Sequence, residues 1–392
     1  MSEVAVSRCA SYEEEEVGHA VAEALGRLGG LGRFVKQGQK VLLKPNLLSA
    51  KPPEACVTTH PAVLEAVARE TLRIGAKPII GDSPPYQGHM PGGYERLCQV
   101  TGVRGVAERL GIEVVSMDRP WREVETGGQR FKRLPVASAF LDADVVINLP
   151  KLKTHGLTAF TGSLKNMFGC VPGLKKSQFH LQARRDREVF AQALVDVFAA
   201  CRPALSVMDA ITAMDGEGPA HGDLKPVRLI LASADSVALD AAACEIVGAA
   251  PSSVIHLRLA AEQGLGEIRP EHIELIGEEL DELRVEGFRI PSAAGPSPSG
   301  GIRAPILGLL RRQFVAMPRV DERLCVACGA CVEVCAAGAM ELVEKAGGKP
   351  GTVARPNLET CIACYCCDEA CPYGAIKLRR GWLGQLFWRV HR

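Results

Sequence analysis

Eight cysteines near the C-terminus stand in two runs of identical spacing, Cys-x-x-Cys-x-x-Cys-x-x-x-Cys. The members of the first run and then of the second are Cys325, Cys328, Cys331, Cys335, Cys361, Cys364, Cys367 and Cys371. A tight loop with this spacing brings three thiolates onto three irons of one [4Fe–4S] cube, while the fourth cysteine has turned away and ligates the other cube. The sequence therefore predicts two [4Fe–4S] clusters and single-electron transfer.

Zinc is the alternative metal, because Cys-x-x-Cys pairs also build four-cysteine zinc sites. Such a zinc site needs two pairs. Here both runs add a fourth cysteine at the same distance from the third, which a zinc site does not require. The repeated fourth member favours iron–sulfur clusters.

The same segment, residues 320–378, resembles the bacterial two-cluster ferredoxins. The resemblance implies that each cluster takes one ligand from the other run. The implied sets are Cys325, Cys328, Cys331 and Cys371 for one cluster, and Cys361, Cys364, Cys367 and Cys335 for the other. Ala336 departs from the family pattern, which usually has proline after the first run. Cys366 is a ninth cysteine and an alternative ligand, although the regular spacing favours Cys367.

The elements that position any further chemistry lie in residues 1–290, where short apolar runs alternate with longer helical patterns. Strands are expected at 41–44, 78–81, 112–115, 144–149, 204–208 and 227–232, and helices at 12–28, 61–74, 186–200 and 235–248. This alternation indicates βαβ units. We therefore predict an α/β fold, a mostly parallel sheet flanked by helices, with a small α+β ferredoxin-like domain at the C-terminus.

Polar residues follow several of these strands, and ligands of open parallel sheets bind beyond the carboxyl ends of the strands. The candidates are Lys44, Asn46, Asp82, Lys151, Lys153, His155, Lys165 and Asn166. The first three are candidates for cofactor binding and the other five for catalysis, with the lysines as donors to an anion and His155 as a proton donor or acceptor. Taken singly, each is equally typical of a solvated loop, and Asp82 of a turn cap. The prediction of a site for a small anionic substrate or cofactor rests on their joint location.

Asp209, Asp215 and Glu217 follow another strand and permit two interpretations. They are suited to hold a divalent metal through oxygen ligands, or to fix a glycine-rich turn, and we favour the turn. The glycines at 26–32 follow a helical pattern and form no Gly-x-Gly-x-x-Gly, so no nicotinamide site is expected. No flavin motif is present, which leaves the identity of any additional redox cofactor open. The six remaining cysteines show no ligand spacing and are expected in the core.

Residues 2–285 also resemble the family called domain of unknown function 362. The phrases that carry the resemblance are KPN at 44–46, GDSP at 81–84, NLPKLKTH at 148–155, GSLKNMFG at 162–169 and MDAITAMDGEGP at 208–219. A two-cluster ferredoxin domain is a common companion in this family, and many members look like proteins of anaerobes. The family name assigns no reaction.

The bulk properties limit the partners. The 392 residues carry a net charge of +1, so no overall field attracts nucleic acid. The sequence shows no secretory signal and no apolar run long enough for a transmembrane segment, and we expect a cytoplasmic protein. Residues 1–290 form the expected large domain and 320–378 the cluster domain. A Pro/Ser/Gly-rich linker and docking segment at 291–319 joins them, and an aromatic and basic tail follows at 379–392.

These features predict an oxidoreductase that passes single electrons between a redox partner protein and a small anionic substrate at the large domain. The alternative is a non-catalytic electron carrier or cofactor-assembly factor whose large domain recognises a partner protein. A third hypothesis is that the clusters are purely structural and that the large domain performs a non-redox reaction. It does not explain why two coupled clusters are present.

Overall fold

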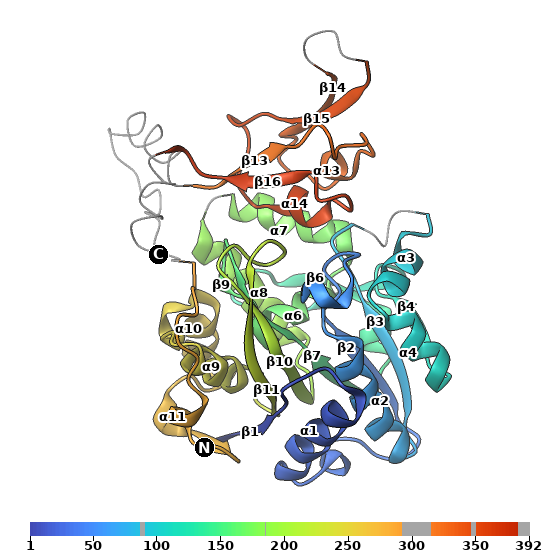
Figure 1. Cartoon of the computed structure of the whole chain (residues 1–392), viewed down its shortest axis with the longest axis vertical. Helices are drawn as coiled ribbons and strands as arrows, with labels where there is room; N and C mark the ends of the chain where they lie inside the picture. Colours follow the sequence, from blue (N-terminus) through green and yellow to red (C-terminus); the bar gives the residue numbers. More distant parts are fainter. Residues whose placement is uncertain (87–90, 185, 292–314, 346–349, 383–392) are drawn as a thin grey trace. The chain divides into compact units, whose positions relative to one another are not determined.

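The structure, a computed structural model, describes residues 1–392 except 87–90, 185, 292–314, 346–349 and 383–392. The chain forms two compact units (Figure 1). The large unit comprises Met1–Lys175 and Glu188–Ala294, and the cysteine-rich unit comprises Lys176–Arg187 and Gly295–Arg392. Most of the expected docking segment and of the expected tail lies outside the described residues.

A ten-stranded sheet forms the centre of the large unit, in the order β12-β1-β11-β10-β7-β2-β3-β4, with β8 paired to β10 and β9 to β8. The strands are β1 (Ser2–Arg8), β2 (Lys40–Pro45), β3 (Lys77–Asp82), β4 (Glu113–Ser116), β7 (Val145–Leu149), β8 (Lys151–His155), β9 (Ala159–Phe160), β10 (Leu205–Asp215), β11 (Asp223–Ser233) and β12 (Ile273–Ile276). The β2 ladders to β3 and β7 are parallel, whereas β11 is antiparallel to β1 and β10. The predicted mostly parallel sheet is confirmed.

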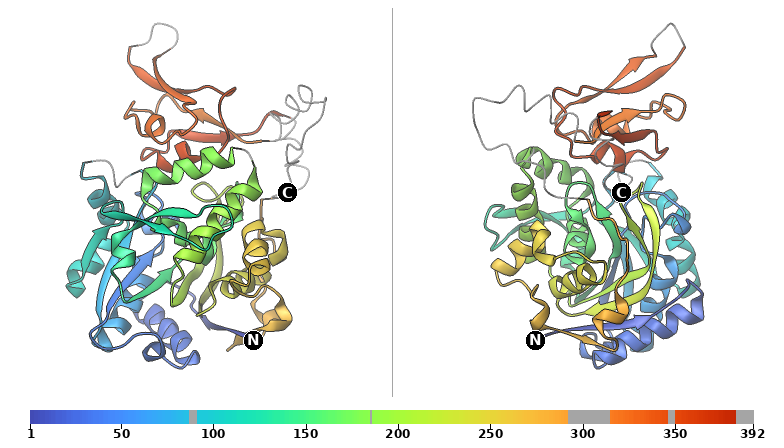
Figure 2. Two further views of the ribbon diagram at one scale, coloured as in Figure 1. Left: turned by 180° about the vertical axis from the view of Figure 1, so that it is seen from behind. Right: turned by 60° about the vertical axis from the view of Figure 1, so that its left-hand side comes forward.

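Helices cover both faces of this sheet (Figure 2). They are α1 (Glu14–Arg27), α2 (Pro61–Arg73), α3 (Gly93–Val100), α4 (Val103–Leu110), α5 (Ser138–Leu141), α6 (Gly162–Asn166), α8 (Arg187–Ala200), α9 (Ser236–Ile246), α10 (Ile255–Glu262) and α11 (Leu280–Leu283). Successive strand residues face opposite sides, and both Leu42 and Leu43 of β2 are fully buried. Burial on both faces explains the continuous apolar runs and the α/β fold. No helix in the described ranges is long and apolar enough to cross a membrane.

Two aspartates accept hydrogen bonds from the first amides of helices near the strand ends. The carboxylate of Asp235 accepts hydrogen bonds from the amides of the first turn of α9. Asp240, within α9, accepts hydrogen bonds from the amides of Ser163 at 2.5 Å and Leu164 at 2.9 Å, at the start of α6. Because those amides have no partner inside their own helix, Asp240 fixes the helix that carries Lys165 and Asn166.

Residues 151–155, expected as a loop after a strand, form the strand β8. Pro150 separates it from β7. Strand β10 continues past its ladder with β7, and its later part pairs with β8, with Asp209 opposite Lys151 and Met214 opposite Lys153. No local pattern predicts this strand, because its partner residues lie more than fifty positions further along the chain.

The cysteine-rich unit is built from two small antiparallel pairs, β13 with β16 and β14 with β15. Its elements are α7 (Lys176–Ala183), β13 (Met317–Val320), α13 (Ala330–Glu333), β14 (Met340–Glu344), β15 (Thr352–Pro356), α14 (Cys366–Ala370) and β16 (Ile376–Arg379). A further hairpin, β5 (Trp121–Glu125) with β6 (Arg133–Ala137), belongs to the large unit.

Candidate functional site

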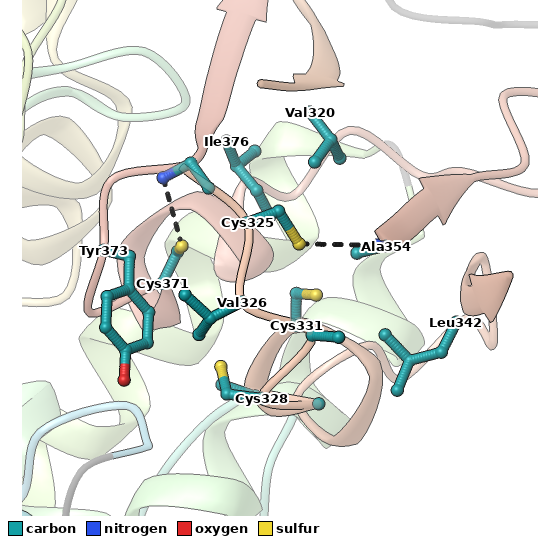
Figure 3. A pocket seen from close by; sticks show the side chains of 14 residues that line it. Val320, Cys325, Val326, Cys328, Cys331, Leu342, Ala354, Cys371, Tyr373 and Ile376 are labelled. Carbon is teal, nitrogen blue, oxygen red and sulfur yellow. Dashed lines mark hydrogen bonds between the residues drawn. The ribbon is translucent and has the colours of Figure 1, made fainter. Parts of the chain in front are cut away.

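The first cysteine pocket takes three thiols from the first run and one from the second (Figure 3). The four cysteines that line it are Cys325, Cys328, Cys331 and Cys371. The first two lie in the loop between β13 and α13, the third lies in α13, and the fourth follows α14. Val320, Leu342 and Ile376 contribute apolar walls. The structure thus brings together the ligand set that the ferredoxin resemblance implies.

Backbone amides point at the sulfurs of this first pocket. Ala354 N–H donates to Sγ of Cys325 at 3.5 Å, and Ala375 N–H donates to Sγ of Cys371 at 3.3 Å. Hydrogen bonds to thiolate sulfur stabilise its negative charge and are a main control of cluster potential. The donors are therefore suited to a ligated cluster.

The second pocket repeats this arrangement with one extra thiol. Its lining cysteines are Cys335, Cys361, Cys364, Cys366 and Cys367. Ala339 N–H donates to Sγ of Cys335 at 3.2 Å, and Ala363 N–H donates to Sγ of Cys361 at 3.4 Å. Four of the five thiols are the set expected for the second cluster.

The two cysteine loops also repeat in backbone conformation. Ala327 and Ala363, two residues after the first cysteine of each run, both have φ of 55°. Gly329 has φ of 81°, and Tyr365 at the equivalent position of the second loop has φ of 68°. Left-handed backbone at matched positions curls each loop around its pocket. Four thiols, amide donors and apolar walls in each pocket fit a [4Fe–4S] cube.

Cys366 is buried and contacts one of the expected ligands. Its thiol donates a hydrogen bond to the sulfur of Cys364, and this bond lowers the pKa of Cys364. His180 of α7 lies beside both, and the three potential ligand atoms are within 4.8 Å of one another. The sequence marked Cys366 as an alternative ligand but gave no indication of His180.

In the large unit, Lys44 at the end of β2 and Asp82 at the end of β3 form a buried ion pair. The Lys44 Nζ to Asp82 Oδ1 distance is 2.7 Å, and both side chains are at most 5% exposed. The other Asp82 oxygen accepts the N–H of Leu47 at 2.8 Å. Parallel pairing of β2 and β3 places the two strand ends side by side, as the sequence analysis assumed.

Gly169 lies against this ion pair, and we predict that Gly169→Ala destabilises the protein. A methyl group at that position would overlap both Asp82 Oδ1 and Lys44 Nζ. Overpacking of this kind costs about 1–3 kcal/mol of unfolding free energy, measured by urea denaturation. The matched control is Gly26→Ala in α1, where an added Cβ meets no atom within 4 Å. That change should stabilise by about 0.5–1 kcal/mol, and equal losses in both variants would contradict the prediction.

A second buried pair joins β8 to β10. Lys151 Nζ lies 2.8 Å from Asp209 Oδ1. The hydroxyl of Tyr12 accepts from Lys151 at 2.6 Å and donates to the same carboxylate oxygen at 2.9 Å. The ring of His60 stacks on Tyr12 with centroids 3.8 Å apart, and the backbone N–H of His60 donates to Asp209 Oδ2 at 3.0 Å. Burial is the main reason that the pKa of His60 falls to about 4. Sequence reasoning missed Tyr12 and His60.

The amide residues link the strand ends into one network. Lys153 Nζ donates to Asn46 Oδ1 at 2.7 Å and to the carbonyl of Val57 at 2.6 Å. Asn46 Nδ2 donates to Asn166 Oδ1 at 3.1 Å, and Asn166 Nδ2 donates to Asn148 Oδ1 at 2.7 Å. Residues from β2, β7, β8 and α6 thereby meet at one edge of the sheet.

A basic group near α6 is formed by Lys165, His155 and His256. His155 is buried, and its Nδ1 accepts the N–H of Leu157 at 3.0 Å. His256 of α10 is also buried, and neither of its ring nitrogens has a hydrogen-bond partner. Burial first, and then the charges of Lys165 and His155, lower the pKa of His256 to about 3. The sequence analysis did not single out His256.

We predict that His256 makes the large unit acid-sensitive. Below about pH 6.5 the unfolded chain binds a proton at this residue that the folded protein does not bind. Stability is therefore complete above that pH and falls as the pH drops toward 3. Each pH unit in this window costs up to about 1.4 kcal/mol. Urea unfolding at about pH 7 and about pH 5 should show a larger loss in wild type than in His256→Leu. An unchanged slope in His256→Leu would refute the assignment.

Two of the three carboxylates considered for a divalent metal form ion pairs instead. Asp209 pairs with Lys151, as described above. Asp215 Oδ1 lies 2.6 Å from the guanidinium of Arg289, whose amide also donates to Asp215 at 3.1 Å. Glu217 is exposed. Asp209 and Asp215 lie within β10, so the strand continues through the residues that the sequence analysis placed in a turn after it.

Hydrogen bonds and one ion pair join five of the eight predicted residues of the large unit, namely Lys44, Asn46, Asp82, Lys153 and Asn166. The eight residues differ in accessibility. Lys44, Lys151 and Lys153 are at most 1% exposed and already contact protein acceptors. Lys165 and Asn46 are partly exposed. The accessible polar groups at this edge come from Lys165 and Asn46, together with Tyr12 and His60.

Comparisons with known proteins give two family matches. The family described as Domain of unknown function (DUF362) matches residues 41–245, and the 4Fe-4S dicluster domain matches residues 324–375. These matches fall where the two sequence resemblances were placed.

A relative and a solved structure are also similar. The "Thylakoid-associated protein sll1697" of Synechocystis sp. is 37% identical over 295 residues, which is 75% of this chain and 89% of that protein. The lactate racemase apoprotein of Thermoanaerobacterium thermosaccharolyticum is 13% identical, with a TM-score of 0.41 over 62% of this chain and 56% of that chain.

Proposed function

The chain belongs to the family of the domain of unknown function DUF362, and from that premise we propose that this iron–sulfur protein is an oxidoreductase. Two [4Fe–4S] clusters pass single electrons between a redox partner protein and a small anionic substrate or cofactor at the strand ends of the large unit. One observation carries the proposal, namely that a single chain contains both a pair of cysteine pockets and a basic strand-end group.

The cysteine-rich unit supplies the electron path. Bound clusters provide one-electron steps at potentials that their surroundings set. The chain contributes the amide donors, which hold negative charge on the sulfurs of residues such as Cys325 and Cys335. Buried apolar residues such as Ile376 limit water at the first pocket. A redox partner protein is the simplest source of the electrons.

The large unit supplies the anion site. The buried charges of Lys44 and Lys151 are balanced by Asp82 and Asp209, so they add little attraction for a ligand. Lys165 is the partly exposed lysine of the set. Nδ1 of His155 accepts a hydrogen bond, which places the proton of the neutral ring on Nε2 as a donor. Together they suit an anionic oxygen and a proton transfer.

We predict that Lys165→Met abolishes substrate-dependent oxidation of the clusters. The wild-type protein, purified without oxygen, should contain about eight irons and give a spin-coupled EPR signal after dithionite reduction. A screen of small carboxylates and phosphates should then find one that reoxidises the reduced clusters stoichiometrically. Lys165→Met should keep the irons but lose this reoxidation, because the charge that attracts the anion is gone.

The control is Lys77→Met at the opposite end of β3, which should reoxidise like wild type. Ferricyanide should reoxidise all three proteins equally, since it takes electrons without the large unit. A Lys165→Met protein that consumes the same anion at the wild-type rate would refute the site. About four irons, or zinc, in the wild-type protein would refute the electron path.

A non-catalytic electron carrier or assembly factor is the second candidate. The observation that favours it is the saturation of Lys44, Lys151 and Lys153 by protein acceptors, because buried lysines that are already paired hold the strand ends rigid and are not available to a substrate. In that case reduced protein hands electrons to another protein, and no small anion in the screen is consumed.

A cytoplasmic location is proposed because the thiols that line the two cysteine pockets suit a reducing compartment. The relative's name associates that protein with the thylakoid. Cell fractionation under native salt and after high-salt washing distinguishes free protein from protein held at a membrane surface.

A further inference from the structure

The second cysteine pocket contains one more thiol than a cube has iron corners. Cys366 lines this pocket together with the four expected ligands. The equivalent position of the first loop is Ala330, so the first pocket has no counterpart. The surplus thiol is therefore specific to the second pocket.

Local backbone geometry brings the surplus thiol to one particular ligand. Tyr365 lies between Cys364 and Cys366 and has a left-handed φ of 68°. This turn places the two sulfurs on the same side of the loop, where the Cys366 thiol donates to the Cys364 sulfur. A nitrogen of His180 lies within 4.8 Å of both. Three atoms that can ligate iron thus surround one corner of the pocket.

We propose that Cys366 is a reserve ligand for the iron that Cys364 holds, so that this corner of the second cluster can exchange its thiolate. In the exchange the Fe–S bond to Cys364 breaks and an Fe–S bond to Cys366 forms. The proton of the Cys366 thiol passes along the existing hydrogen bond to Cys364. No electron is transferred, and the net charge of the cluster with its ligands is unchanged. The inference rests on the proposed second cluster. It predicts that this cluster keeps all its irons when Cys364 is removed.

Removal of Cys364 tests the exchange directly in the full-length protein. Cys364→Ala, purified without oxygen, should retain about eight irons and the spin-coupled EPR signal of the wild type. The matched control is Cys361→Ala, which removes another ligand of the same cluster that is not part of the group formed by Cys364, Cys366 and His180. That control should lose iron and the spin coupling. Cys364→Ala/Cys366→Ala should behave like the control.

The double variant identifies the replacing ligand. Iron that is retained in Cys364→Ala, and lost when Cys366 is removed as well, assigns the new bond to Cys366. Iron loss in Cys364→Ala equal to that in Cys361→Ala would overturn the proposal, as would two complete clusters in the double variant. A wild-type protein with only about four irons would refute the second cluster itself, which separates the two failures.

Discussion

Asp209→Ala should lower the free energy of unfolding by about 3–5 kcal/mol. The Asp209 carboxylate is fully buried, pairs with Lys151 at 2.8 Å, and accepts hydrogen bonds from Tyr12 and His60. Its removal leaves the ammonium of Lys151 in the core without a counter-charge. The desolvated charge sets the size of the effect, more than the lost contact does. Urea denaturation followed by far-ultraviolet circular dichroism measures it.

Two further variants isolate the buried charge as the cause. Lys151→Met/Asp209→Ala removes both charges and should regain much of the lost stability. Asp142→Ala breaks the exposed pair with Arg122 and should cost less than about 1 kcal/mol. A cost for Asp209→Ala no larger than that for Asp142→Ala would contradict a buried pair.

Cys371→Ala should remove the cluster of the first cysteine run, although Cys371 belongs to the second. The side chain lines the pocket of Cys325, Cys328 and Cys331. Iron should fall from about eight to about four atoms, and the spin coupling between reduced clusters should disappear. Alkylation of the folded variant should label the three first-run cysteines and spare Cys361.

The reciprocal variant is Cys335→Ala. Alkylation of this folded variant should label Cys361, Cys364 and Cys367 and leave the first-run thiols unlabelled. Cys98→Ala in α3 controls for loss of a buried thiol that lines neither cysteine pocket, and it should keep all the iron. Labelling of the second run in Cys371→Ala would show that each run serves its own cluster.

The main strands and helices of the large unit were predictable because their signals are local. Apolar runs such as 41–44 and 78–81 became β2 and β3, and the capping type of Asp235 marked the start of α9. The ligand sets of the two pockets were implied by spacing and resemblance together. Each of these signals lies within a few residues of the element that it specifies.

The environment of the lysines was not predictable, because it depends on long-range partners. Lysine is a surface residue by type, yet Lys44 and Lys151 are fully buried beside aspartates 38 and 58 positions away. Tyr12, which precedes α1, stacks on His60, which precedes α2, and no sequence motif links the two residues. The packing of residues 176–187 with the cysteine-rich unit likewise has no local signal.

The exchange of fourth ligands between the runs has a consequence for how the pockets of the cysteine-rich unit are completed. A peptide with one run places three thiols in its own pocket and sends the fourth elsewhere. Such a peptide, alone, completes no pocket. A separate peptide of that kind would need a second copy to close its pocket. In this chain both runs belong to one polypeptide, so each pocket is closed within the molecule, and the two runs differ at Cys366, whose equivalent in the first run is Ala330.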